Sequence, residues 1–166
     1  ALACRVKAEI SQVEINRDFL FERIQHYWLS NVSPLEPRDC SATCLFAFRF
    51  GDGLIHLGML GDGLVAALKP DGSVVSLTEN KGYGFSNITT ALSTNVSLNE
   101  WRHISLPEEE CIAVFLCTDG VADDLDDVDG FVSGFIEAHC SIAEISANRR
   151  TREMLEKWPT PKHSDD

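Results

Sequence analysis

The first part of the chain has apolar residues at helical spacing. Two stripes share this spacing, the first made of Leu2, Val6, Ile10 and Val13 and the second of Leu20, Ile24, Tyr27 and Trp28. Pro34 and Pro37 follow the second stripe, and proline does not continue a helix. The pattern therefore predicts a helical segment over residues 1–33.

From Cys40 onward the pattern changes to short β-prone runs separated by turns that contain glycine. Four strands are predicted in this region, at residues 41–50, 54–60, 64–69 and 73–77. The turns between them are too short to hold crossover helices. We therefore expect an antiparallel meander in which consecutive strands are neighbours.

The second half of the chain returns from strand to helix. Residues 79–99 are polar and lack periodicity, so a long surface loop is expected there. A strand is predicted at residues 102–106 and a buried strand at 111–117, and residues 120–158 are mainly helical with a break at Cys140-Ser141. Helices on both sides of a mainly β region, residues 40–118, predict an α+β fold.

Length and charge limit the possible functions. The 166 residues suit one domain, and 44% hydrophobic with 24% charged residues indicates a globular chain rather than a disordered one. The net charge of −12 repels nucleic acid and anionic membranes, so neither is an expected partner. No run approaches the ~20 apolar residues of a membrane span. The sequence does not indicate an oligomeric state.

The six cysteines bear on the cellular compartment. They form no close Cys-x-x-Cys pair and several lie in apolar runs, which favours reduced and mostly buried thiols. Three Asn-x-Ser/Thr triplets, at Asn31, Asn87 and Asn95, are compatible with secretion but arise often by chance. We therefore expect a cytoplasmic protein.

A hydrophobic run that ends in Thr118-Asp119-Gly120 is the clearest candidate for chemistry. Five further aspartates follow Asp119 within ten residues, at positions Asp123, Asp124, Asp126, Asp127 and Asp129. Helix capping explains Asp119 alone, and solvent explains the later acids. A hard divalent cation is the better explanation for Asp119 together with Asp123, since residues four apart share a helical face.

Two other acidic segments are ambiguous by themselves. Gly61-Asp62-Gly63 separates two predicted strands, but Gly51-Asp52-Gly53 has the same composition ten residues earlier. One such turn therefore indicates no more than a hairpin. Near the end of the chain, Ser164-Asp165-Asp166 is equally compatible with a solvated tail.

Taken in order, these segments resemble the metal-dependent serine/threonine protein phosphatases of the type 2C family, from about residue 40 to 166. Four segments carry the resemblance. Ser41-Ala42-Thr43-Cys44-Leu45 is similar to the family's Ser/Thr-rich strand start, and Leu60-Gly61-Asp62-Gly63 is similar to its Gly-Asp-Ser segment. Thr118-Asp119-Gly120-Val121-Ala122-Asp123 is similar to the family's Ser-Asp-Gly-x-x-Asp segment, and Ser164-Asp165-Asp166 is similar to its Asp-Asn segment.

The resemblance implies both a fold and an activity. The fold is a sandwich of two antiparallel β-sheets flanked by helices. The activity is hydrolysis of phosphoserine and phosphothreonine in phosphoprotein substrates, by a water activated on two Mn²⁺ or Mg²⁺ ions. By position, Asp119 and Asp165 correspond to ligands of the binuclear centre, and Asp62 and Asp123 to carboxylates of a further, weaker metal.

One part of the family pattern has no counterpart in the sequence. The family carries an earlier Asp-Gly segment with two N-terminal strands and a phosphate-binding arginine, and nothing before Cys40 matches them. We therefore expect a partial domain with weak metal occupancy. The alternative is a catalytically incomplete phosphatase-like module that binds or regulates other proteins.

Two other hydrolase classes fit less well. Haloacid-dehalogenase enzymes need a second aspartate two residues after the first, and Val121 occupies that position. Ser/His/Asp hydrolysis lacks a Gly-x-Ser-x-Gly segment, and the five histidines lie in unrelated contexts. His56 alternates with Ile55 and Leu57, which indicates a residue on a strand face rather than a catalytic base.

Overall fold

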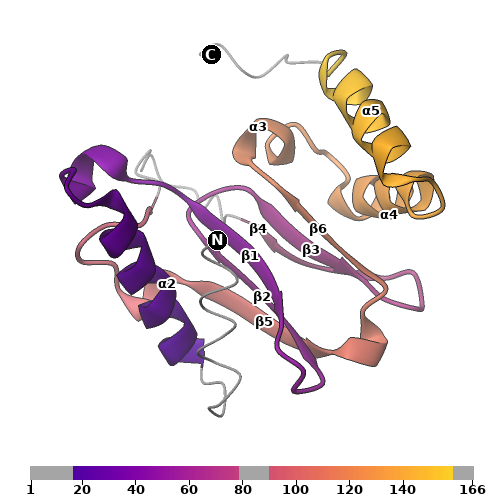
Figure 1. Ribbon diagram of the computed structural model, residues 1–166. Coiled ribbons are helices and arrows are strands. Elements are labelled where there is room, and N and C mark those ends of the chain that lie inside the picture. The colour runs from indigo at the N-terminus through magenta and orange to yellow at the C-terminus, as the bar shows by residue number, and fades with distance from the viewer. Residues whose placement is uncertain (1–16, 79–89, 159–166) are drawn as a thin grey trace.

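Two antiparallel sheets packed face to face form the centre of the computed structural model, which describes residues 17–78 and 90–158 (Figure 1). The strands are β1 (Cys44–Arg49), β2 (Leu54–Leu60), β3 (Leu64–Leu68), β4 (Val74–Thr78), β5 (Arg102–Pro107) and β6 (Ala113–Cys117). The first sheet has the order β1-β2-β5 and the second β4-β3-β6. The predicted α+β fold with two antiparallel sheets flanked by helices is confirmed.

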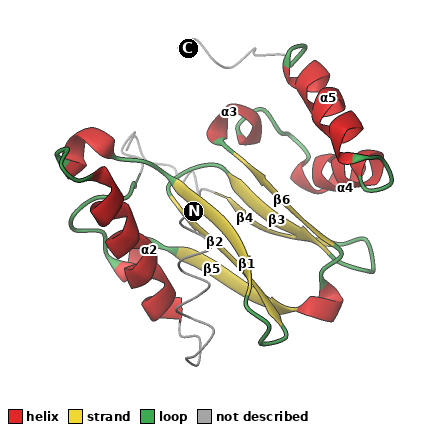
Figure 2. Cartoon of the chain, in the orientation of Figure 1, coloured by secondary structure: helices red, strands yellow, loops and turns green. Residues whose placement is uncertain are grey.

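Helices lie outside the two sheets (Figure 2). They are α2 (Arg17–Val32), α3 (Asp119–Ala122), α4 (Val128–His139) and α5 (Glu144–Leu155), with short 3-10 helices at Pro37–Cys40, Leu98–Glu100 and Glu108–Glu110. Helix α2 covers the first sheet, and α4 covers the second. The predicted helix break at Cys140-Ser141 is confirmed, since α4 ends just before it and α5 begins just after it. None of the described helices has the length and apolar character needed to cross a membrane.

Helix α2 uses the second apolar stripe of the sequence. Leu20, Phe21 and Ile24 are buried against the first sheet, and the Phe21 ring stacks on Trp101 with centroids 4.8 Å apart. Burial of such side chains stabilises the fold by roughly 1.5–3 kcal/mol each. The first predicted stripe, in residues 2–13, lies outside the described residues.

The core between the two sheets comes mainly from their central strands. Its buried members are Leu57, Met59, Val65, Ala67 and Leu106. Strands β2 and β3 have both faces covered, because each is the middle strand of its sheet and a helix covers the outer side. Their continuous apolar sequences follow from this double burial.

The predicted meander is wrong at one connection. Strands β1 and β2 pair, and so do β3 and β4, but β2 and β3 belong to different sheets. The chain changes sheets at Gly61-Asp62-Gly63, where both glycines have positive φ angles of 96° and 109°. Turn length and composition cannot distinguish a hairpin from a change of sheet, so the sequence did not reveal this step.

The predicted burial of residues 111–117 is also wrong. Strand β6 lies at the edge of its sheet, since β3 occupies the centre. Phe115 is buried against Phe131 and Phe135 of α4, whereas Val114 and Leu116 stay 41% and 38% exposed. The alternation therefore buries one face of β6 and leaves the other open.

The described cysteines are free, but they are less buried than expected. Cys40, Cys44, Cys111 and Cys117 are half-buried, and Cys140 is exposed. The expectation of mostly buried thiols is therefore wrong, because edge strands and helix ends leave part of each side chain open. Burial raises the pKa of the Cys44 and Cys117 thiols to about 11.

Candidate metal site

The pairing of β3 with β6 brings two of the predicted metal ligands to the same edge of the second sheet. Leu64 pairs with Cys117, so Asp62 comes two residues before this last pair and Asp119 two residues after it. The backbones approach closely here, because a Cβ added at Gly63 would lie 2.7 Å from the Cys117 carbonyl oxygen. The turn of Asp62 therefore lies beside the end of β6.

Asp119 and Asp123 lie on a single helical turn that follows β6 directly. The Asp123 amide donates to the Asp119 carbonyl at 2.9 Å, as expected for residues four apart in a helix. The Thr118 side chain makes no capping hydrogen bond, and Asp119 is the first residue of α3 rather than its cap. Capping thus does not account for the exposed Asp119 carboxylate.

A hollow of about 270 Å³ lies between the Asp62 turn and the helical turn that ends at Asp123. It is lined by Gly63, Leu64, Thr78, Ala122, Asp123, Leu125 and Val128. Asp123, which is half-buried, therefore opens into the same space as the turn of Asp62. Thr78 and Leu125 carry no motif that indicates this region, because only the fold brings the end of β4 next to α3.

Other acids of the cluster have structural roles. The Trp158 indole donates to Asp124 Oδ2 at 3.0 Å, which ties the end of the α5 region to α3. Asp127 caps α4 by accepting from the Gly130 amide at 2.9 Å. Asp126, Asp127 and Asp129 are exposed, in agreement with the solvent explanation of the sequence analysis.

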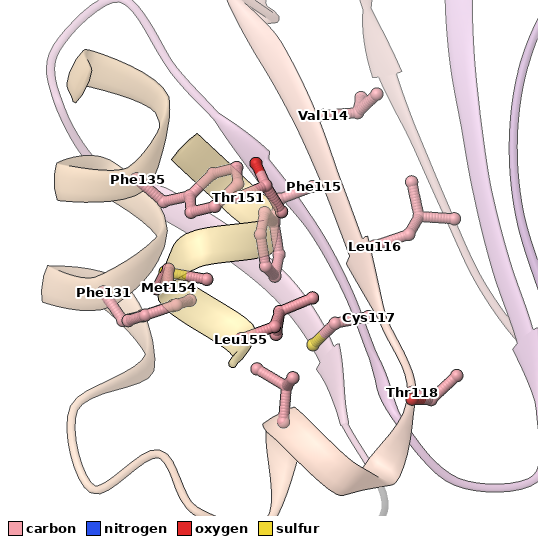
Figure 3. Close-up of a pocket in the computed structure, with 11 residues that line it drawn as sticks. Val114, Phe115, Leu116, Cys117, Thr118, Phe131, Phe135, Thr151, Met154 and Leu155 are labelled. Carbon is pink, nitrogen blue, oxygen red and sulfur yellow. The ribbon is translucent and has the colours of Figure 1, made fainter. Parts of the chain in front are cut away.

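The apolar cavity beside β6 is a separate feature (Figure 3). It has a volume of about 400 Å³ and lies between β6 and helices α4 and α5, where Phe131, Phe135, Met154 and Leu155 line it. Figure 3 shows Val114 and Leu116 on the opposite side of the strand from these helices. Among the described residues that line the cavity none is charged, so it does not suit a phosphate group.

Comparison with known proteins identifies the family of the chain. The family model of protein phosphatase 2C matches residues 2–158. The chain belongs to the protein phosphatase 2C family. No curated protein and no solved structure gives a significant match. Membership makes phosphatase chemistry the general function, and the family generally depends on Mn²⁺ or Mg²⁺.

The residues present fit the family's metals in donor chemistry. Carboxylate oxygens are the ligands that Mn²⁺ and Mg²⁺ prefer, and Asp62, Asp119 and Asp123 supply them at one edge of the sheet. Within residues 17–78 and 90–158, however, no three His, Cys, Asp or Glu side chains are grouped as a metal site. The fourth predicted ligand, Asp165, lies outside the described residues.

Proposed function

We propose that this phosphatase 2C domain takes part in metal-dependent hydrolysis of phosphoserine and phosphothreonine in proteins. The observation that carries the proposal is the register of β3 with β6, which brings Asp62 and Asp119 to the edge where Asp123 opens into the hollow. Within residues 17–78 and 90–158, this edge combines the motif residues Asp62, Asp119 and Asp123 with an opening that Thr78 and Asp123 line.

The roles of the chain's own residues follow from their positions. Asp119, exposed at the end of β6, would hold the metals together with Asp165, and Asp62 and Asp123 would hold a further ion from the side of the hollow. Bound Mn²⁺ or Mg²⁺ would activate a water and neutralise the phosphate charge. The close approach of Gly63 to Cys117 holds the two acidic segments at a fixed separation.

The test is phosphate release from a phosphoserine or phosphothreonine peptide, measured with Mn²⁺, with Mg²⁺ and with a chelator. We expect release that depends on the metal and is abolished by Asp119→Asn. Asp71→Asn is the matched control, because Asp71 lies in the β3–β4 turn and its carboxylate accepts from the backbone and hydroxyl of Ser73. Release that persists in the presence of the chelator would contradict the mechanism.

A second candidate is a phosphatase-like module that binds other proteins without catalysis. The observation that favours it is the lack of a three-residue metal group within the described parts of the chain. Titration with Mn²⁺ separates the two candidates. Binding that Asp119→Asn weakens supports the enzyme, whereas no measurable binding supports the module.

A further inference from the structure

A hydrogen-bonded chain of three side chains lies on the outer face of the first sheet, away from the phosphatase edge. His56 of β2 stands between Asp52 of the β1–β2 turn and Ser105 of β5. His56 Nε2 lies 2.9 Å from Asp52 Oδ2, and His56 Nδ1 lies 3.1 Å from Ser105 Oγ. The cross-strand pairing of His56 with Ser105 sets this arrangement.

The hydrogen bonds determine which nitrogen of His56 carries the proton. An ionised carboxylate only accepts, so His56 Nε2 donates to Asp52 and His56 Nδ1 keeps its lone pair. Partial burial opposes ionisation of Asp52, but hydrogen bonds from His56 and the Leu54 amide outweigh it and lower the pKa of the carboxyl. The free lone pair of His56 therefore faces the Ser105 hydroxyl.

Among the three hydrogen-bonded side chains, the histidine is buried and the serine is exposed. A serine nucleophile requires this, because the substrate must reach its hydroxyl. The His56 side chain is only about 5% exposed, whereas Ser105 is exposed to solvent. His103 lies beside them, with Nε2 3.4 Å from Ser105 Oγ and its ring stacked on His56 at 5.6 Å. Burial lowers the pKa of His103, and the neighbouring His56 and Arg17 lower it further. The His103 ring is therefore neutral, and its N–H group can donate a hydrogen bond to a developing oxyanion.

We propose that Ser105, His56 and Asp52 form a second site, which hydrolyses neutral carboxylic esters that carry an aromatic group. The ring centroid of the half-buried Phe50 lies 5.5 Å from that of His56, so an aromatic side chain borders the buried imidazole. Asp52 adds negative charge beside His56, and the net charge of −12 disfavours anionic substrates. The preferred substrate is therefore uncharged, in contrast to that of the phosphatase edge.

The reaction balances with an ester and water alone. Ser105 Oγ attacks the carbonyl carbon while its proton moves to His56 Nδ1, and the leaving alcohol takes that proton as the C–O bond breaks. Water then attacks the acyl-serine, again passing a proton to His56, and the acid is released as Ser105 regains its hydrogen. Asp52 is a positioning residue that holds the imidazole in the required tautomer. The usual Ser-His-Asp arrangement has the two ring nitrogens in exchanged roles.

The experiment treats the full chain with p-nitrophenyl acetate and follows p-nitrophenolate release and acetylation by peptide mass spectrometry. We expect a burst of one equivalent and an acetyl group on Ser105, neither of which depends on chelator. Ser105→Ala abolishes both, and His56→Gln slows the burst by about a hundredfold or more. Ser73→Ala is the matched control, because the Ser73 hydroxyl bonds a carboxylate, Asp71, and has no imidazole beside it in any described contact.

Asp52→Asn gives a readout that a structural role would not change. The amide oxygen must accept from Leu54, so the NH₂ group turns to His56 Nε2 and forces the proton onto Nδ1. We expect nitrogen NMR to show this change of tautomer together with a burst at least about tenfold slower. Acetylation that is equal in Ser105→Ala, or unchanged in Asp52→Asn despite the new tautomer, would overturn the proposal. Circular dichroism identifies any variant that fails to fold, and Ser105→Ala and Asp52→Asn are both surface changes.

Discussion

Two turns of identical composition, Gly51-Asp52-Gly53 and Gly61-Asp62-Gly63, are built differently in this fold. The first joins β1 to β2 within one sheet, and the second carries the chain from one sheet to the other. A Cβ at Gly53 would meet nothing within 4 Å, whereas a Cβ at Gly63 would lie 2.7 Å from the Cys117 carbonyl. The tripeptide permits a tight turn, but the burial of the flanking strands decides where the turn leads.

The two aspartates differ as much as the turns do. Asp52 is held by His56 and by the Leu54 amide in the first sheet. Asp62 lies beside the end of β6, which Asp119 follows in the chain. The same residue in the same tripeptide thus has two different surroundings, and only the tertiary structure distinguishes them.

The largest expected effect is that of alanine at the two glycines. Gly53→Ala has only a positive φ angle to accommodate, at a cost of roughly 1–2 kcal/mol. Gly63→Ala also brings its Cβ into collision with the Cys117 carbonyl oxygen. Its free energy of unfolding should therefore fall by at least about 2 kcal/mol more than that of Gly53→Ala. Urea denaturation of both variants measures the difference. Equal losses would show that the two turns have the same surroundings after all.

Exchanging each aspartate for asparagine separates the two sites. We expect Asp62→Asn to reduce the rise in melting temperature that Mn²⁺ produces, because a carboxylate oxygen is lost from the metal edge. Asp52→Asn should leave that rise unchanged and slow the acetylation of Ser105. Differential scanning calorimetry with and without Mn²⁺ reports the first effect. If both variants lost the Mn²⁺-dependent rise in melting temperature to the same extent, Asp52 and Asp62 would not belong to separate sites.

The stability contribution of Asp52 depends on pH. Its pKa is lowered in the folded protein, so the contribution is present above the usual value of 3.8 and is lost as the pH falls through the folded-state pKa. Asp52→Asn should therefore be less stable than the native protein at neutral pH, and this gap should close in strong acid. Denaturation of both proteins over a pH series checks the trend, and a gap that widens in acid would contradict it.

The smallest effect concerns the ion pair beside the first turn. Arg49 Nη2 lies 2.6 Å from Glu108 Oε2, but the Arg49 side chain is largely exposed. Arg49→Ala should cost no more than about 1 kcal/mol, and added salt should reduce even that difference. Thermal denaturation at two salt concentrations provides the measurement. A loss that salt does not change would mean that Arg49 acts through packing of its alkyl chain.

Local patterns sufficed for much of the fold. The stripe of Leu20 and Ile24, the break at Cys140-Ser141 and the strand at residues 102–106 all depend on neighbours in sequence, and the structure contains each of them. The change of sheet at Asp62 depends on which strand becomes central, which is a property of the whole core. The edge position of β6 has the same origin, because β3 takes the central place.

In the candidate sites, too, some residues follow from local sequence and others only from the tertiary structure. Asp62, Asp119 and Asp123 are predicted as metal ligands from segments that are each local in sequence. Thr78 could not be predicted, because it approaches α3 only through the pairing of β4 with β3. The sequence predicts His56 to be a strand-face residue rather than a catalytic base, because it alternates with Ile55 and Leu57 and no Gly-x-Ser-x-Gly segment occurs. Only the pairing of β2 with β5 brings it to Ser105, 49 positions later in the sequence.

The open side of the sandwich has a consequence for how copies of this chain behave together. Strands β1 and β6 are edge strands, and a groove of about 470 Å³ between them is lined by apolar residues that include Leu45, Ala47, Val114 and Leu116. Such an edge favours pairing with another chain, and a net charge of −12 opposes it by repulsion between copies. Salt shortens the range of that repulsion to about 10 Å at 0.1 M. Concentrated solutions should therefore stay clear at low ionic strength and grow turbid as salt is added.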